Sequence, residues 1–434
     1  MSPLFCGIAM ALGWGLRGEF GGPAGAMIPG AFMGLAIALT SGRSDWLRKA
    51  PIFGAAGAFA FALGGTMSYG RIIGYTRGID MPNVMYGFAM LGVVGGLWGA
   101  FGAGCIGLVA SGRRYAVWQI VAFVATAYLL GKGLHWLLVD MAGLRMTPPR
   151  GDGWPECIGA CMALRGLCWL KRDALPPRLM LWGLMAGSIG FMLGDAIQVC
   201  ALSTIRSLFD WWKVMEMTFG FILGAGIAYG VRCECADAEP TPPPYVLLAL
   251  GFLVVVWFVP WVTVQDLLGN FREKDIIRIP EGGIDTIWHF HVRLFAVLGM
   301  LVFIAWHLRR HEGPIVEPEL GAKGLFLWAM WVCLFLGDWK MALPQWGLTS
   351  MSIHAVFLAC ATVLTLWAVL GLRPAQSWGA RRVPLRIVAP AFALLFAVLC
   401  VVVSAAAIAS HNGEWPEGGA HLRFGEEPTL DTTK

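Results

Sequence analysis

Six long stretches without a charged side chain are the feature that most restricts how this chain can fold. Each has at least the roughly 20 residues that a helix needs to cross a bilayer core about 30 Å thick. The stretches are Phe20–Gly42, Ala50–Gly70, Met81–Gly112, Pro240–Gln265, Met341–Leu372 and Ile387–Ser410. They predict an integral membrane protein that crosses the bilayer several times, with membrane lipids as its surroundings.

The overall composition agrees with this prediction. Charged residues make up 14% of the 434 residues, hydrophobic residues make up 57%, and the mean hydropathy is +0.67. Globular proteins in water carry about 25% charged residues. The formal net charge of +5 lies mainly between the apolar runs. Basic residues there set membrane orientation, so we expect no nucleic-acid partner.

The apolar runs predict an all-α polytopic membrane bundle of about thirteen transmembrane helices, with twelve as the alternative. The predicted helices start near residues 3, 24, 51, 84, 115, 154, 178, 214, 245, 286, 324, 350 and 386. The sixth, Trp154–Leu170, distinguishes the two arrangements because it is short and contains Arg165. The Lys/Arg totals of the loops do not separate them. We favour thirteen with a cytoplasmic N-terminus, because the compact basic loops 43–49 and 113–114 then lie inside.

Glycine content divides the chain into two membrane halves. Residues 1–232 hold 41 of the 57 glycines. A Pro-rich linker, residues 233–244, separates this Gly-rich half from a five-span half, residues 245–410. The polar tail, residues 411–434, is predicted to be a flexible extramembrane end. Eleven cysteines, scattered mostly through apolar runs, argue against a disulfide framework and are expected to pack as small residues.

The Gly-rich half contains a weak three-fold internal repeat. Three polar, Gly-rich segments, 13–22, 64–71 and 187–195, each lead into another Gly-rich apolar run. Each unit is predicted to be a helical hairpin, and such repeats build many transporters with helices broken near the substrate. Chance similarity among Gly-rich helices is the alternative interpretation.

Glycine spacing within these runs predicts close helix packing. Gly183, Gly187, Gly190 and Gly194 recur at spacings of four, three and four, which places them on one helical face. The series Gly92–Gly96–Gly99 and the pair Gly220–Gly224 do the same. In lipid, such faces let backbones approach closely. The segment 17–23 contains three glycines and a proline, so we expect it to interrupt a helix.

Ionisable residues in the hairpin tips are the candidate binding site. Charged groups at membrane depth are costly and usually mark a pathway or pocket. The candidate site residues are Arg17, Glu19, Arg71, Asp195, Gln198 and Glu216. Arg17 and Arg71 would orient an anion near the start of a helix that follows Gly21–Pro23, while the carboxylates would bind a proton or coupling ion. The structural alternative is that Arg17 pairs with Glu19, and Lys213 with Asp210 and Glu216, to close the hairpins.

The second half offers weak metal candidates, namely His289, His291 and His354. His289 and His291 are two residues apart, so they would point about 200° apart on a helix and would not share a ligand face. No pair of histidines has the spacing of a haem site. We therefore expect no metal site from these residues, and the sequence assigns no cofactor.

Three functions remain open from the sequence. The first is a membrane transporter or channel for a small, anionic solute, which uses the Arg and carboxylate residues at broken Gly-rich helices. The second is a membrane-embedded enzyme acting on a lipid-linked or envelope substrate, with His289, His291 or His354 as general base and Asp285 or Asp338 orienting it. The third is a non-catalytic accessory subunit of a larger membrane complex.

The surroundings and motifs narrow these functions only slightly. We expect a bacterial inner (plasma) membrane and a homo-oligomer or larger membrane complex. The sequence contains no nucleotide-binding loop, serine nucleophile elbow or zinc-protease motif, so ATP-driven pumping and serine hydrolysis have no support.

Overall fold

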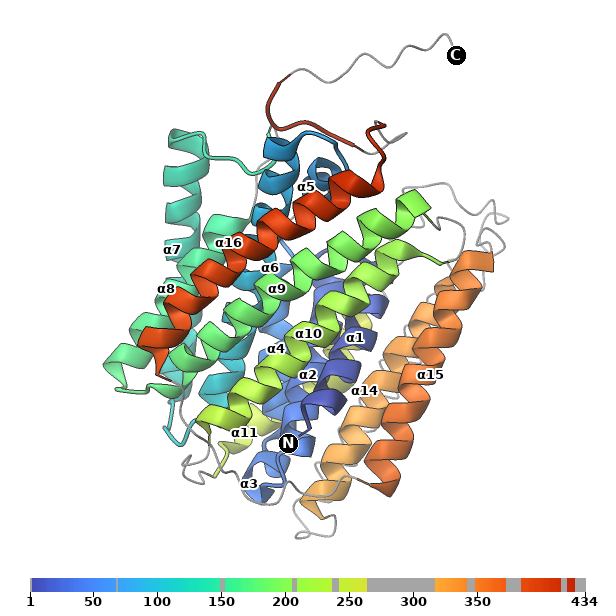
Figure 1. Ribbon diagram of the computed structural model, residues 1–434. Coiled ribbons are helices and arrows are strands. Elements are labelled where there is room, and N and C mark those ends of the chain that lie inside the picture. Colours follow the sequence, from blue (N-terminus) through green and yellow to red (C-terminus); the bar gives the residue numbers. More distant parts are fainter. Residues whose placement is uncertain are drawn as a thin grey trace, which may run out of the picture.

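A computed structural model shows an all-helical protein (Figure 1). It describes residues 2–67, 69–148, 153–204, 209–235, 242–263, 317–341, 348–371, 384–414 and 420–425. These ranges contain no β-strand. The prediction of an all-α fold is confirmed for the part of the chain that the structure describes.

The described residues of the first half, up to the linker, form ten α-helices and one π-helical segment. They are α1 (Pro3–Phe20), α2 (Gly22–Thr40), α3 (Ser44–Arg48), α4 (Ala50–Gly64), α5 (Gly70–Thr76), α6 (Met81–Ala110), α7 (Val117–His135), η1 (Trp136–Met141), α8 (Trp154–Leu170), α9 (Leu175–Thr204) and α10 (Trp211–Glu234).

The described residues of the second half form four further α-helices and a π-helical continuation of the first of them. They are α11 (Tyr245–Leu253), η2 (Val254–Phe258), α14 (Pro318–Met341), α15 (Leu348–Leu370) and α16 (Leu385–Ser410). The predicted span that starts near residue 286 lies outside the described residues, as do His289, His291 and Asp285.

Nine helical segments of the described chain are long and apolar enough to cross a membrane. They include α2, α6, α9, α10 and α16. The protein is therefore a helical membrane protein with multiple candidate spans. The sixth predicted span is a helix, α8, with the bounds expected from the sequence. It is shorter than these nine, as is α4, and α1, with 18 residues, is not among them either.

The predicted helix interruption in segment 17–23 is confirmed. The helix α1 ends at Phe20 and α2 begins at Gly22, so one residue connects them. That residue, Gly21, has a φ of +65°. This backbone conformation favours glycine because a Cβ atom would crowd the neighbouring carbonyl group.

Glycine contacts hold the longest helices together. A Cβ atom on Gly99 of α6 would lie 2.0 Å from the carbonyl oxygen of Gly183 on α9, and one on Gly187 would lie 2.0 Å from that of Gly95. A Cβ atom on Gly220 of α10 would likewise lie 2.6 Å from the carbonyl oxygen of Met10 on α1. The close approach that the glycine spacing predicts is therefore present between α6 and α9 and between α1 and α10.

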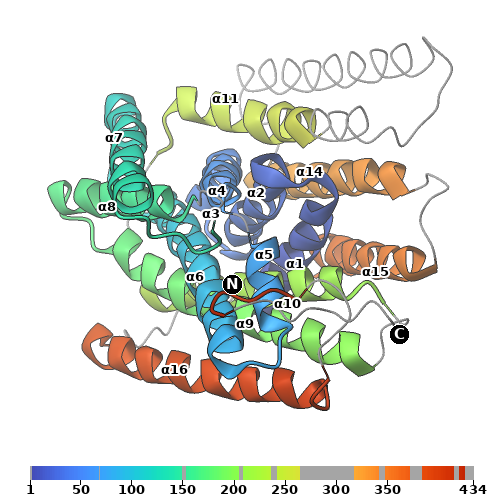
Figure 2. The ribbon, with the colours of Figure 1, turned by 90° about the horizontal axis from the view of Figure 1, so that it is seen from above.

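The arrangement of the helices is clearest from above (Figure 2). The helices α7 and α8 lie at one edge, α14 and α15 at the opposite edge, and α16 along the outside of α6 and α9. The helix α1 packs against α2 and α10 near the centre. Because α14 contacts α2 and α16 contacts α9, the two sequence halves pack against each other. The boundary at residues 233–244 stays a prediction.

All eleven cysteines lie in the described ranges and are free, which confirms that they do not form a disulfide framework. The described part of the tail differs from the flexible end expected. His421 donates a backbone hydrogen bond of 2.9 Å to the carbonyl oxygen of Gly74, and the backbone of Phe424 exchanges two hydrogen bonds with Asn83. Asn83 therefore satisfies backbone polar groups of Arg423 and Phe424 and holds this part of the tail against α6.

Candidate functional site

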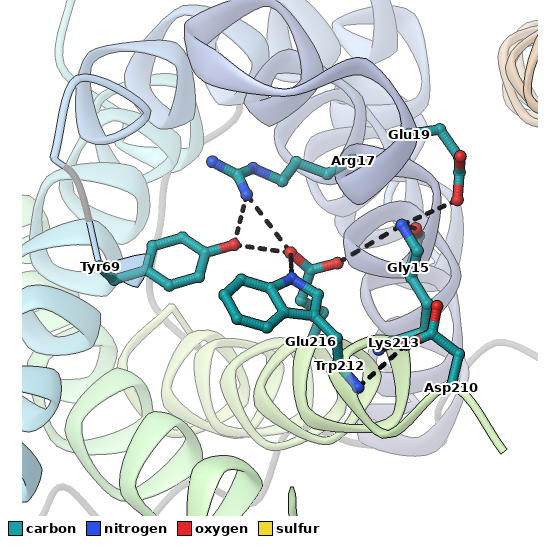
Figure 3. A network of polar contacts seen from close by, with 8 residues as sticks. All are labelled: Gly15, Arg17, Glu19, Tyr69, Asp210, Trp212, Lys213 and Glu216. Carbon is teal, nitrogen blue, oxygen red and sulfur yellow. Dashed lines mark hydrogen bonds and ion pairs between the residues drawn. The ribbon is translucent and has the colours of Figure 1, made fainter. Parts of the chain in front are cut away.

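A buried polar network joins α1, the segment before α5, and α10 (Figure 3). Glu216 lies at its centre, and its Oε1 atom accepts hydrogen bonds from the Tyr69 hydroxyl at 2.6 Å, Trp212 Nε1 at 3.2 Å and Arg17 Nη1 at 3.3 Å. Arg17 Nη1 also donates to the Tyr69 hydroxyl oxygen. The Tyr69 hydroxyl thus accepts from Arg17 and donates to Glu216, which links the two charged groups.

A second ion pair adjoins the first. Lys213 Nζ lies 2.8 Å from Glu19 Oε1 and 3.9 Å from Glu216 Oε2, and it donates to the carbonyl oxygen of Gly15 at 3.3 Å. The side chains of all four charged residues, Arg17, Glu19, Lys213 and Glu216, are at least nine-tenths buried. Two cationic and two anionic groups therefore balance one another in a site that excludes most solvent.

Aromatic rings surround the guanidinium group of Arg17. Its central carbon lies 5.1 Å from the ring centre of Tyr69 and 5.8 Å from those of Trp14 and Trp98. Tyr69 also stacks on Trp212 at a centroid distance of 5.8 Å. Cation–π attraction strengthens when the cation is removed from water, so these rings stabilise a charge that the membrane would otherwise disfavour.

The pairing within the network agrees only in part with the structural alternative considered for the sequence: Lys213 lies 3.9 Å from Glu216, as that alternative expected. Arg17 and Glu19 each bind a partner on α10. The physical reason is that residues two apart on a helix point to different sides, whereas α1 and α10 pack side by side and bring Lys213 and Glu216 to both. Asp210 accepts backbone hydrogen bonds from Trp212 and Lys213 and so caps the start of α10.

Glycine 18 makes room for the two ion pairs. A Cβ atom on Gly18 would lie 2.1 Å from Lys213 Nζ and 2.3 Å from Glu216 Oε2. We expect Gly18→Ala to lower the thermal stability of the detergent-solubilised protein, because these two side chains would have to move apart. The matched control is Gly166→Ala in α8, where a Cβ atom meets nothing within 4 Å. Equal melting temperatures for the two variants would show that the network accommodates the methyl group.

Comparison with family models, with curated proteins and with solved structures finds no match for this chain. The function must therefore be argued from the chemistry of the side chains. What the network offers is a guanidinium group and a tyrosine hydroxyl, both bound to one carboxylate that a proton could neutralise.

Three of the six predicted site residues join this network and three lie elsewhere. Arg17, Glu19 and Glu216 are brought together. Asp195 and Gln198 are buried on α9, where Asp195 lies beside Thr76, the last residue of α5, and the following Arg77. Arg71 is half-buried on α5. In the described chain, none of these three has a hydrogen bond or ion pair to Arg17 or Glu216.

Sequence reasoning missed two members of the site, Tyr69 and Trp212, and placed Lys213 only as a partner of Asp210 and Glu216 in the structural alternative. Tyr69 lies inside the polar segment 64–71, and Trp212 and Lys213 precede Glu216 by four and three residues. Residues three and four apart share a helical face, so this spacing could have identified Trp212, as well as Lys213, as a neighbour of Glu216. Tyr69 had no comparable signal, since its position depends on how the segment before α5 folds back.

The weak metal candidates gain no support from the described residues. His354 is half-buried on α15, where its ring lies 5.6 Å from that of Phe357. Across the described ranges, no group of three or more His, Cys, Asp or Glu side chains is placed to hold a metal ion.

Proposed function

We propose that this protein is a membrane transporter for a small anionic solute, and that Arg17 and Glu216 couple anion binding to a proton. The observation that carries the proposal is that one buried carboxylate, Glu216, occupies the donors of both Arg17 and Tyr69. Ionisable groups inside a membrane protein generally mark a substrate or proton path. The experiment below separates this role from ion pairing that only stabilises the helix packing.

The mechanism follows from the charge balance. When Glu216 binds a proton, it loses its attraction for Arg17, while Lys213 keeps its closer partner Glu19. The guanidinium of Arg17 and the hydroxyl of Tyr69 then become available as hydrogen-bond donors to an anion. One proton and one anion restore neutrality together. Release of the proton returns Glu216 to Arg17 and displaces the anion, because both compete for the same donors.

The test is proton movement driven by an anion gradient in proteoliposomes that contain a trapped pH-sensitive dye. Inorganic phosphate, sulfate and succinate would be offered one at a time. We expect the wild-type protein to move protons with at least one of these anions, and Glu216→Gln to abolish that movement because the amide cannot bind the proton.

The chain supplies a matched control for this variant. Glu234 lies on the same helix, is also buried, and binds Arg178 at 2.9 Å and Trp182 Nε1 at 3.3 Å, but at the other end of α10. We expect Glu234→Gln to keep transport. Anion-driven proton movement that survives in Glu216→Gln, or that none of the three anions produces in the wild-type protein, would contradict the proposal.

We also propose thirteen crossings with a cytoplasmic N-terminus in a bacterial inner membrane. The count adds α1, α4, α8 and the span predicted near residue 286 to the nine candidates. Contacts between the segment before α7 and the segment after α8 support α8 as a crossing. Tyr115, before α7, donates to Asp173, after α8, at 2.6 Å, and Lys171 lies 5.9 Å from the Tyr115 ring. Both segments therefore lie at one end of the bundle, which two crossings between them require.

Orientation follows from the basic residues at that end. The segments 43–49, 113–114 and 171–172 carry seven Lys or Arg residues. Lys49, Arg113, Arg114 and Lys171 line one common surface there. The positive-inside rule places such an end in the cytoplasm, and an even number of crossings, α1 and α2, separates it from the N-terminus.

A further inference from the structure

A large groove lies between α7 and the rest of the bundle, away from the Arg17–Glu216 network. Its volume is about 1640 Å³, and residues of α4, α6, α7, α8 and α11 line it. Its walls are mostly apolar, as at Ala56, Phe59, Phe123, Val124 and Leu250. The helix α7 forms its outer wall and stands at the edge of the molecule in Figure 2. In the candidate span Val117–Met141, which contains α7, only 11% of the apolar stretch is buried inside the protein. The groove therefore opens where lipid surrounds the protein.

The length of the groove matches a membrane. It is lined along α7 from Ala116 to His135. The 19 residues of α7 rise about 28 Å, since an α-helix rises about 1.5 Å per residue. The hydrocarbon core of a bilayer is about 30 Å thick. An occupant that follows this groove thus lies parallel to the acyl chains of the bilayer.

The two ends of the groove differ in charge. Lys49, Arg113, Arg114 and Lys171 line one end, which the ends of α6 and α8 and the start of α4 form. At the other end, Glu156 binds Lys132 at 3.3 Å and His135 at 3.0 Å. Glu156 is the only acidic residue among the described residues that line the groove. Among the described lining residues, one end therefore carries four cations and no carboxylate, and the other carries a carboxylate with its own cations.

We propose that this groove is a binding site for an anionic phospholipid, whose phosphate lies among Lys49, Arg113, Arg114 and Lys171 and whose acyl chains run along α7. Basic pockets between transmembrane helices attract anionic headgroups at the cytoplasmic leaflet. Arginine binds a phosphate group through two parallel hydrogen bonds. The positive charge of the cluster favours a headgroup with a net negative charge over a zwitterionic headgroup. The site is independent of the proposed transport function, since no residue of the Arg17–Glu216 network lines it.

A phospholipid accounts for both the basic end and the apolar walls of the groove, whereas each other occupant accounts for only one of these features. Free phosphate would use the basic end and leave the apolar walls uncovered. An apolar helix of a partner would cover the walls but would bring no anion to the basic end. The charge and the apolar length together therefore favour a single molecule with both properties.

The experiment is native mass spectrometry of the full chain in detergent, with phosphatidylglycerol or phosphatidylcholine added at matched concentrations. We expect the wild-type protein to retain phosphatidylglycerol selectively. Arg113→Gln/Arg114→Gln should weaken that binding by about 25-fold, because each lost charge near a lipid surface weakens attraction about fivefold. Both arginines are exposed, so this variant should fold. The control is Arg172→Gln/Arg232→Gln, which removes two exposed cations outside the groove and should leave binding unchanged.

A second variant tests the apolar part. Ala56→Trp fills the wall of the groove with a larger side chain, and it should reduce phosphatidylglycerol binding without changing any charge. Equal retention of the two lipids, or unchanged binding in Arg113→Gln/Arg114→Gln, would overturn the proposal. Displacement of the lipid by inorganic phosphate, with Ala56→Trp binding normally, would also overturn it and assign the basic end to a free anion. Thermal unfolding of each variant would show that the comparison is made on folded protein.

Discussion

Glu216→Ala is expected to be among the most destabilising single substitutions in this protein, with a loss of about 3–5 kcal/mol in the free energy of unfolding. The substitution removes the acceptor of three hydrogen bonds and leaves the buried guanidinium of Arg17 without its carboxylate. Removal of one partner from a buried pair costs far more than removal of both, because the remaining charge is unpaired. Arg17→Ala should be costly for the same reason.

A double-mutant cycle measures this coupling. We expect Arg17→Ala/Glu216→Ala to be more stable than the sum of the two single losses predicts, since no uncompensated charge then remains from this pair. The measurement is reversible unfolding in detergent or bicelles. The cycle on Arg178 and Glu234 is the control, and its coupling should be smaller because Arg178 has 31% of its side chain exposed. Additive losses at Arg17 and Glu216 would show that the two charges do not stabilise each other.

Gly99→Val is expected to destabilise the fold by at least about 3 kcal/mol, which is the upper part of the range for overpacked positions. The first atom of the new side chain would lie 2.0 Å from the carbonyl oxygen of Gly183 and 2.9 Å from Leu223 on α10. Backbone atoms cannot rotate away as a flexible side chain can. The two helices α6 and α9 would therefore have to separate along their contact.

Gly133→Val on α7 is the matched control, because a Cβ atom there meets nothing within 4 Å. The two variants exchange the same residue types within helices, so helix propensity affects both alike. The measurement is the yield of monodisperse protein together with its unfolding free energy. Similar stability of the two variants would show that α6 and α9 can separate without loss.

The sequence predicted the fold to the extent that single helices determine it. Apolar runs located the helices because membrane thickness fixes their length. The interruption at Gly21 was predictable from glycine and proline, and the contact between Gly99 and Gly183 was predictable in kind from glycine spacing. The sequence did not predict which helix is the partner, since α1 and α6 could each have packed closely against a glycine face of a different helix.

The candidate site shows the same limit. The carboxylate of Glu216 and the guanidinium of Arg17 were recognisable as unusual in an apolar run, but their pairing depends on α1 lying against α10. Asp195 and Gln198 have equally polar side chains and lie elsewhere, beside α5. The groove has no clear signal in the sequence, because no single segment forms it. It results from the spacing between α7 and the helices α4 and α11.

The order in which the chain is made gives the charge network a further consequence. Arg17 precedes Glu216 by 199 residues. At a synthesis rate of roughly 5–20 residues per second, the ribosome needs about 10–40 s to supply that partner. During this interval the first helix contains a cation and an anion, Arg17 and Glu19, whose later partners have not yet been translated. Assembly of the amino-terminal hairpin is thus completed by a helix that is synthesised near the midpoint of the chain.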